Sequence, residues 1–191
     1  MEKVYQIKIT IQGIEPPIWR RIVIPSDITF ARLHKYIQAS FGWQNYHLYN
    51  FEFQDFVVTL PSDEFASGEL YGKPEKNPRS TKIDAYMTEG AKFTYTYDLG
   101  DDWIHEVVVE KVLKAEDEYS YPVCLDGERH RPPEDVGGVG GYEEFIRIIS
   151  DSNHPDYENM LIWAEKDTGG RKFDPEYFYR NEVNRELRKI K

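Results

Sequence analysis

The order of the two hydrophobic patterns limits the fold more than any other feature of this chain. Residues alternate between polar and apolar types near the N-terminus, whereas the longer runs with helical spacing follow residue 141. Antiparallel strands placed before helices do not build alternating β-α-β units. The order therefore predicts an α+β fold with a mainly antiparallel sheet and C-terminal helices. A length of 191 residues suits one domain, so we expect residues 1–191 to form a single domain.

The first 53 residues predict a β-β-α-β opening. Two extended runs, residues 4–11 and 18–24, flank a proline-containing turn and are typical of a hairpin. Apolar side chains at offsets 0, 3, 4, 7 and 11 from Phe30 give one helical face, and Gly42 is a suitable end for that helix. The alternation in residues 47–53 predicts a third strand.

Residues 93–113 predict a second, longer hairpin. Pairing Tyr97 with Trp103 places Tyr95 opposite His105, and this register gathers the aromatic side chains on one face. Such a register requires an odd number of residues at the tip of the hairpin.

The remaining segments predict one loop and several helices. Residues 61–82 combine prolines, glycines and charges with few apolar residues, which indicates an exposed loop. One or two helical turns are expected over residues 83–87. Longer helices are expected from Tyr142, over residues 156–165, and after Asp174, which would cap the last one.

Composition restricts the class of protein but names no reaction. Asp and Glu number 34 against 24 Lys and Arg, a net charge of −10, which argues against a basic nucleic-acid coat. The single cysteine, Cys124, cannot close an intramolecular disulfide, so we expect a reducing, cytoplasmic setting. The longest uncharged apolar run, residues 160–164, is far shorter than the ~20 residues that a transmembrane helix requires, so no membrane association is expected.

The tip of the second hairpin is the densest polar cluster. It contains Asp98, Asp101 and Asp102, followed closely by Trp103 and His105. Carboxylate oxygens and an imidazole could hold a divalent cation, for which Asp101 and His105 are the candidates. The register places Asp98 and Asp102 on the face opposite His105, which argues against one ion bound by all of them. A tight acidic turn without a metal and acid/base chemistry are the alternatives.

A second cluster follows in residues 124–138. Cys124 with His105 or His130 could form a thiol–imidazole pair, although a small buried thiol is the simpler interpretation. Glu134 and Asp135 could act with His130 at a site, charge the start of the next helix, or pair with Arg129 or Arg131. The glycines at 137–141 could bind phosphate at a helix start, but the acidic neighbours favour a structural turn.

Several motifs taken together resemble the plasmid pRiA4b ORF-3-like family. The resemblance implies an α+β domain found near mobile elements, and it carries no catalytic residue because the family has no established activity. The motifs that carry it are Pro17-Ile18-Trp19-Arg20-Arg21, Phe41-Gly42-Trp43 with His47-Leu48-Tyr49, Tyr97-Asp98-Leu99-Gly100-Asp101 with Trp103 and His105, Pro132-Pro133-Glu134-Asp135-Val136-Gly137-Gly138, and Phe173-Asp174-Pro175.

These observations favour a noncatalytic binding or adaptor module with a polar-aromatic pocket between the second hairpin and the 132–135 loop. A small metal-dependent hydrolase using the same pocket is the alternative, and a DNA-associated accessory protein is the third. Convergence of the candidate side chains on one cleft would favour chemistry, and scattered positions would favour binding. A cationic small molecule, a metal or a protein partner is expected in preference to nucleic acid. The pocket candidates are Asp98, Asp101, Asp102, Trp103, His105, Cys124, Arg129, Glu134 and Asp135.

Overall fold

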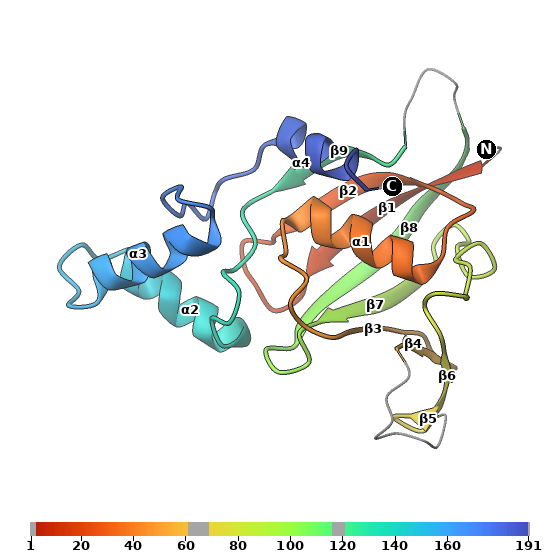
Figure 1. Cartoon of the computed structure of the whole chain (residues 1–191), viewed down its shortest axis with the longest axis horizontal. Coiled ribbons are helices and arrows are strands. Elements are labelled where there is room, and N and C mark those ends of the chain that lie inside the picture. The colour runs from red at the N-terminus through yellow and green to blue at the C-terminus, as the bar shows by residue number, and fades with distance from the viewer. Residues whose placement is uncertain (1–2, 61–68, 116–120, 191) are drawn as a thin grey trace.

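A computed structural model describes residues 3–60, 69–115 and 121–190. Its strands and helices follow the order that the sequence predicts, with all of the described strands before α2, α3 and α4 (Figure 1). The elements are β1 (Lys3–Ile11), β2 (Trp19–Pro25), α1 (Phe30–Phe41), β3 (Tyr49–Glu52), β4 (Val57–Thr59), β5 (Glu69–Leu70), β6 (Lys73–Lys76), β7 (Lys92–Tyr97), β8 (Trp103–Lys114), β9 (Val123–Glu128), α2 (Gly138–Ile149), α3 (Tyr157–Asp167) and α4 (Arg180–Leu187).

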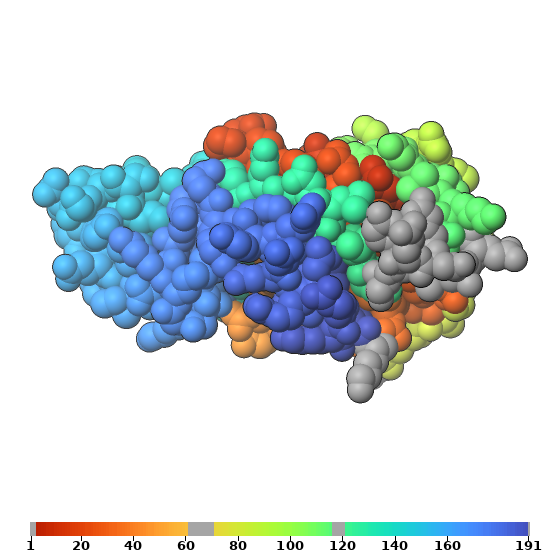
Figure 2. Space-filling view, turned by 90° about the horizontal axis from the view of Figure 1, so that it is seen from above, coloured from red at the N-terminus to blue at the C-terminus, as the bar shows by residue number. Residues whose placement is uncertain are grey.

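The strands form one sheet in the order β5-β6-β4-β3-β7-β8-β1-β2-β9. Neighbouring strands are antiparallel, except that β4 and β6 run parallel. Helices α1 and α4 contact each other, and Figure 1 shows α1 lying across the sheet. Helices α2 and α3 pack together and extend from one end of the molecule (Figure 2). The predicted α+β fold with a mainly antiparallel sheet and C-terminal helices is confirmed.

Helix α1 has the predicted bounds because its two ends carry clear signals. Thr29 Oγ1 accepts a hydrogen bond from the backbone N–H of Arg32, and Gly42 ends the helix in the left-handed conformation at φ 82°. The apolar face that begins at Phe30 is buried against the sheet, where the Phe30 and Phe51 rings lie 5.1 Å apart. This helix leads directly to residues 43–47, which reach the candidate site.

The second hairpin has the predicted register. Tyr97 pairs with Trp103 and Tyr95 pairs with His105, so residues 98–102 form the tip. The rings of Tyr95 and His105 lie 5.2 Å apart, and the Trp103 side chain is fully buried. The hairpin thus holds its aromatic residues in the core and presents its acidic tip beyond the ends of two central strands of the sheet.

The region predicted as a loop over residues 61–82 differs from that expectation where it is described. Residues 69–82 include β5 and β6, and β6 pairs with β4. Residues 61–68 lie outside the described residues. Residues 83–87 form turns in place of the predicted helical turns, because Ile83 donates its backbone N–H to the Ile28 carbonyl at 3.0 Å. Residues 69–82 and 83–87 thus take their conformations from contacts with residues distant in the sequence.

The C-terminal part also differs at several boundaries. Strand β9 was not expected from its mixed composition, and it forms by pairing with β2. Helix α2 begins at Gly138, four residues before the expected Tyr142. Helix α4 begins at Arg180, because Asp174 instead closes a turn by accepting the Glu176 backbone N–H at 2.9 Å. No helix in the described parts of the chain is long and apolar enough to cross a membrane.

Candidate functional site

The hairpin tip and the loop before α2 meet, which brings the two acidic motifs together. Asp101 Oδ2 accepts a hydrogen bond from the backbone N–H of Gly137 at 3.0 Å. The approach requires glycine at the next position, because a Cβ on Gly138 would lie 2.6 Å from the carbonyl oxygen of Asp101. Gly138 also has a φ of +68°, which L side chains rarely adopt. The junction is therefore built by backbone contact.

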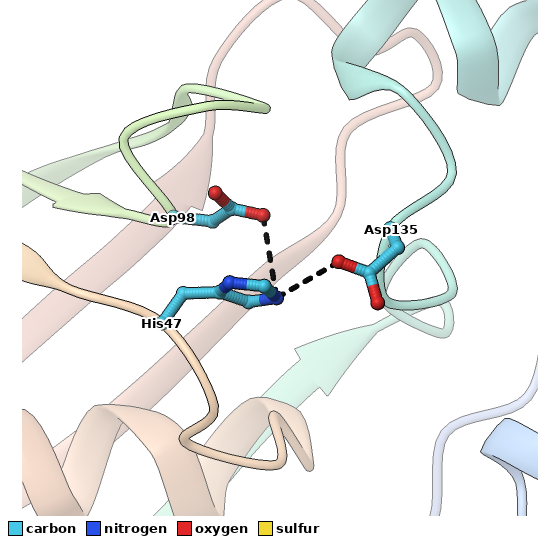
Figure 3. Close-up of side chains that lie close together, drawn as sticks. All are labelled: His47, Asp98 and Asp135. Atoms are coloured by element: carbon cyan, nitrogen blue, oxygen red, sulfur yellow. Dashed lines mark ion pairs between the residues drawn. The ribbon is translucent and has the colours of Figure 1, made fainter.

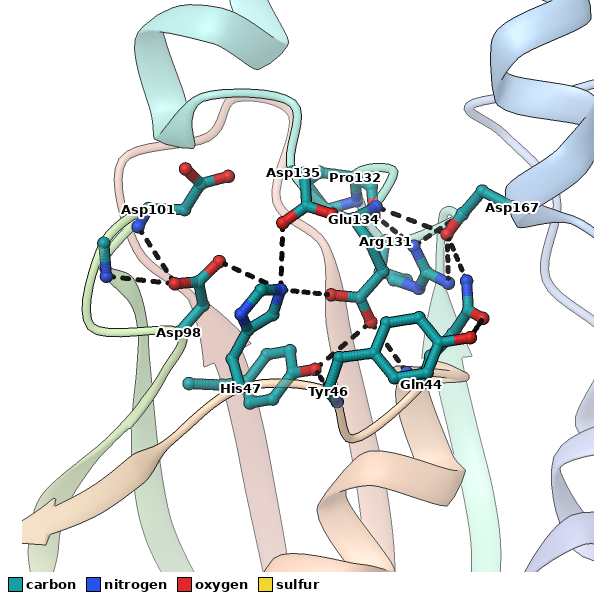
Figure 4. A network of polar contacts seen from close by, with 12 residues as sticks. Gln44, Tyr46, His47, Asp98, Asp101, Arg131, Pro132, Glu134, Asp135 and Asp167 are labelled. Atoms are coloured by element: carbon teal, nitrogen blue, oxygen red, sulfur yellow. Dashed lines mark hydrogen bonds and ion pairs between the residues drawn. The ribbon is translucent and has the colours of Figure 1, made fainter.

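Four side chains form what we call the acidic site, namely His47, Asp98, Glu134 and Asp135 (Figures 3 and 4). His47 Nε2 lies 2.9 Å from Asp135 Oδ1, 3.5 Å from Asp98 Oδ2 and 3.9 Å from Glu134 Oε2. Ligand atoms of His47, Asp98 and Asp135 all lie within 4.8 Å of one another, a spacing that could hold a metal ion. Three segments distant in sequence thus direct their polar groups to one point.

Two of the carboxylates are anchored by one oxygen and directed by the other. Asp98 Oδ1 accepts hydrogen bonds from the backbone N–H groups of Gly100 at 3.0 Å and Asp101 at 3.3 Å. Glu134 Oε1 accepts the backbone N–H of Gln44 at 2.7 Å. Each residue therefore presents its second oxygen to His47, as Figure 4 shows.

Glu134 is the most buried member of the acidic site. Its side chain is 5% exposed, whereas that of Asp135 is 68% exposed. Burial raises the pKa of Glu134, and the hydrogen bond from Gln44 opposes that shift. Glu134 Oε2 and His47 Nε2 are buried atoms that make no hydrogen bond to any described residue, although carboxylates surround the imidazole. The site therefore contains two buried polar atoms that are free to bind a ligand.

Aromatic rings form one wall beside these groups. Trp43 lies 5.1 Å from the Tyr97 ring and 5.8 Å from the Trp103 ring, and His47 lies 5.8 Å from Tyr97 between ring centroids. The Tyr97 hydroxyl accepts the backbone N–H of Tyr46 at 2.9 Å. Burial raises the pKa of Tyr97, and the nearby Glu134 charge adds to that effect, so this hydroxyl stays protonated.

The nearest arginine in the sequence, Arg131, forms its ion pair outside the acidic site, although its charge opposes the rise that burial causes in the pKa of Glu134. Arg131 directs its guanidinium to Asp167 Oδ2 at 2.7 Å and to the carbonyl oxygens of Pro132 at 2.7 Å and Gly42 at 2.9 Å. Figure 4 shows this pair on the far side of Glu134. The Arg131–Asp167 ion pair fixes the 131–135 loop against α3 and leaves the acidic site with an excess of negative charge.

The structure brings together three of the predicted pocket residues, Asp98, Glu134 and Asp135. Asp101 clamps the two segments, and Trp103 lies in the aromatic wall. Asp102 is exposed at the tip and is not a member of the cluster.

His105 lies in the core, and its two ring nitrogens are both occupied. Nδ1 donates to the Trp103 carbonyl at 2.7 Å and Nε2 accepts the indole N–H of Trp43 at 3.2 Å. Burial lowers the pKa of His105 to about 4, so the ring is neutral. The predicted metal candidates Asp101 and His105 therefore have other partners in this fold.

Cys124 and Arg129 lie on other contacts. The backbone of Cys124 hydrogen-bonds the Asn184 amide on α4, and burial raises the pKa of its thiol to about 11. Arg129 pairs with Glu176 at 2.9 Å and donates to the Pro16 carbonyl. The described positions thus scatter the thiol, the buried imidazole and this arginine away from the acidic site.

His47 is the member of the site that the sequence did not predict, since it stood only at the start of a predicted strand and within one motif of the family resemblance. The structure begins β3 at Tyr49, so His47 belongs to the connection after α1. Its neighbours Tyr46 and Leu48 are 69% and 64% exposed, so the histidine alone turns inward. The histidine inside a recurring family motif was the available signal.

Comparison with known proteins identifies the family. The model of the plasmid pRiA4b ORF-3-like protein family matches residues 3–182. An uncharacterised protein, y4hQ of Sinorhizobium fredii, is 37% identical over 162 residues, covering 84% of this chain and 80% of its own length. The crystal structure of MM3350, a protein of unknown function from Methanosarcina mazei Go1, superposes with a TM-score of 0.84 at 39% identity, covering 96% of this chain and 98% of that one. The chain belongs to the plasmid pRiA4b ORF-3-like family.

Proposed function

We propose that the chain is a noncatalytic binding module whose acidic site receives a positively charged group. The observation that carries the proposal is Glu134 Oε2, a buried carboxylate oxygen without a hydrogen bond, directed at His47. Leaving such a group unsatisfied costs about 1–3 kcal/mol. A cation bound to Glu134 Oε2 would remove that cost. The carboxylates of Asp98 and Asp135 would attract the same cation.

The charge balance supports a cation in preference to an anion. Three carboxylates surround one imidazole, and Arg131 is committed to Asp167. The aromatic wall adds faces that favour cations. Glycines 137 and 138, which a phosphate would need, receive the side chain and backbone of Asp101 instead.

The scattered positions of the other candidates support binding in preference to catalysis. Cys124 and His105, the nucleophile and base that sequence analysis considered, have partners outside the acidic site. A reducing, cytoplasmic setting stays part of the proposal, since the single cysteine is buried in the structure.

A metal-dependent hydrolase is the second candidate, and one observation favours it. A groove of 380 Å³ between α2 and α3 begins at Asp135 and is lined by Val136, Phe145, Met160 and Trp163. An apolar substrate group in this groove would lie beside the acidic site. A screen of ester and phosphoester substrates with added divalent metal, on the wild type and on Asp135→Asn, tests this second candidate.

Thermal-shift titration tests the binding proposal. The probes are divalent metal chlorides, spermidine, a basic peptide and ATP, applied to the wild type, Glu134→Gln and the control Glu143→Gln. Glu143 is exposed on α2, so the control changes the same charge outside the site. We expect cations to raise the unfolding midpoint of the wild type and of the control and to raise that of Glu134→Gln much less. Stabilisation by ATP alone, or an unchanged cation response in Glu134→Gln, would overturn the proposal.

A further inference from the structure

We propose that the cation is a divalent transition metal ion bound by His47 Nε2, Asp98 Oδ2, Glu134 Oε2 and Asp135 Oδ1. This inference rests on the proposed function and specifies its ligand.

The ligand atoms of His47, Asp98 and Asp135 lie within 4.8 Å of one another, a spacing that suits a coordination sphere, and Glu134 lies at the border of this group. Metal–ligand bonds of about 2.0–2.2 Å place adjacent ligand atoms about 3.0–3.5 Å apart and opposite ones up to about 4.3 Å apart. The distances from His47 Nε2 to the three carboxylate oxygens are 2.9, 3.5 and 3.9 Å. Small side-chain movements would draw the oxygens of Asp98 and Asp135 around an ion beside His47, and Glu134 Oε2 would have to move further to join them.

Hydrogen-bond geometry distinguishes this arrangement from an ordinary ion pair. His47 Nε2 is close to three carboxylates and forms a hydrogen bond with none of them. A histidine held only by an ion pair would direct its N–H at one oxygen. Instead, His47 Nε2 lies within 4 Å of three carboxylate oxygens and is bonded to none of them, which is the position that a metal-ligating nitrogen takes.

The ligands are supported in the manner of metal sites. The backbone holds one oxygen of Asp98 through Gly100, and it holds one oxygen of Glu134 through Gln44. Such outer contacts fix the orientation of the ligand oxygens before the ion binds. Asp135, at 68% exposure, leaves one side of the site open to solvent, so bound water could complete the coordination.

The donor set selects the class of metal. Ca²⁺ takes six to eight oxygen ligands and Mg²⁺ prefers oxygen and water, whereas imidazole suits zinc, iron, nickel and copper. The imidazole among these carboxylates therefore favours a first-row divalent ion such as Zn²⁺, Fe²⁺ or Ni²⁺, for which Co²⁺ can serve as a coloured probe. The three negative charges would exceed the charge of one such ion, which supports retention of a dication.

Cobalt titration followed by visible absorption tests the assignment on chelator-treated, tag-free protein. The variants are His47→Gln and Asp98→Asn, and the control is Asp102→Asn, which changes the same charge in an exposed residue of the same tip. We expect the wild type and the control to bind a single equivalent, and each ligand variant to lose at least about tenfold in affinity. Circular dichroism and the metal-free unfolding midpoint show whether each variant is folded.

The outcomes separate this inference from the proposed function. If Co²⁺ binds His47→Gln with unchanged affinity and spectrum, or if Ca²⁺ binds the wild type as tightly as Co²⁺, the metal assignment is wrong. If spermidine stabilises the protein through Glu134 and Co²⁺ does not bind, the binding module survives and the metal assignment fails. If no cation binds, both proposals fail.

Discussion

Gly138 offers the sharpest test of how the acidic site is assembled, because its lack of a side chain lets the hairpin tip reach the loop. In Gly138→Ala the new Cβ would lie 2.6 Å from the Asp101 carbonyl oxygen, where ordinary contact begins at 3.4 Å. The two segments would have to separate by most of 3.4 − 2.6 = 0.8 Å. That movement would weaken the hydrogen bond from Gly137 to Asp101 and shift Asp98 relative to Glu134.

Two energetic costs set the expected loss of stability in Gly138→Ala. A residue with a Cβ at a φ of +68° costs about 1–2 kcal/mol. Overpacking at a contact of this kind costs about 1–3 kcal/mol. The same backbone movement relieves part of both, so we expect Gly138→Ala to lower the free energy of unfolding by about 2–4 kcal/mol.

Urea denaturation followed by tryptophan fluorescence measures this loss, since Trp43 and Trp103 are buried beside the junction. Gly140→Ala is the matched control. It lies two residues further along α2, and a Cβ there would meet nothing within 4 Å. Alanine at this helical position should stabilise the protein by about 0.5–1 kcal/mol. A Gly138→Ala variant within about 0.5 kcal/mol of the wild type would show that the junction is loose and would refute the reasoning.

Three further predictions follow from the same structure. Trp103→Ala should lower the free energy of unfolding by about 3–5 kcal/mol in chemical denaturation, because it removes a fully buried indole, and a loss below ~1 kcal/mol would contradict this. His34, His105 and His130 have their pKa values lowered to about 4 by burial, so the unfolded state binds protons that the folded state does not. Stability should therefore fall as pH falls from about 6.5 to about 4, by up to about 1.4 kcal/mol per pH unit for each histidine, and a flat urea midpoint over that window would exclude the burial argument. A net charge of −10 predicts no tight DNA binding, and submicromolar affinity for labelled duplex or single-stranded DNA at ~150 mM salt would revive the DNA-associated role.

Local patterns predicted the parts of the fold whose signals lie close together in the sequence. Helix α1 combines an apolar face with the caps Thr29 and Gly42, so its bounds followed from local chemistry. The hairpin register followed from the alternation around Tyr95, since a shift of one residue would turn every aromatic to the other face. The residues within each of these two elements are enough to determine its bounds or register.

Local sequence patterns did not predict the elements that depend on partners distant in the sequence. Strand β9 has polar and glycine residues and becomes a strand only because β2 offers an unpaired edge. Strand β6 similarly depends on the parallel partner β4. The turns at residues 83–87 replace helix because Ile83 pairs its backbone with Ile28. In each case tertiary pairing overrides a weak local preference.

The residues of the candidate site also fall into those that local motifs predict and those that only the complete fold brings together. The acidic residues at 98 and 134–135 could be found because each lies in a dense polar motif. Assigning His105 as the nearby imidazole had the appeal of sequence proximity, yet its inward face in β8 places it among Trp43, Tyr95 and Trp103. The imidazole that reaches the carboxylates is His47, which is 51 residues from Asp98 in the chain and meets it only after β3 pairs with β7.

This dependence on the complete fold links the stability of the protein to its proposed ligand. His47 reaches the site through the β3–β7 pairing, Asp98 through the hairpin tip, and Glu134 through the Arg131–Asp167 anchor on α3. An unfolded chain does not hold these groups together, so a cation bound by all of them would bind only the folded state. At a concentration 100 times its dissociation constant, such a ligand would add about 2.7 kcal/mol to the free energy of unfolding. That gain is comparable to the cost of leaving Glu134 Oε2 without a hydrogen bond, so binding of the proposed cation would offset the cost of burying this oxygen.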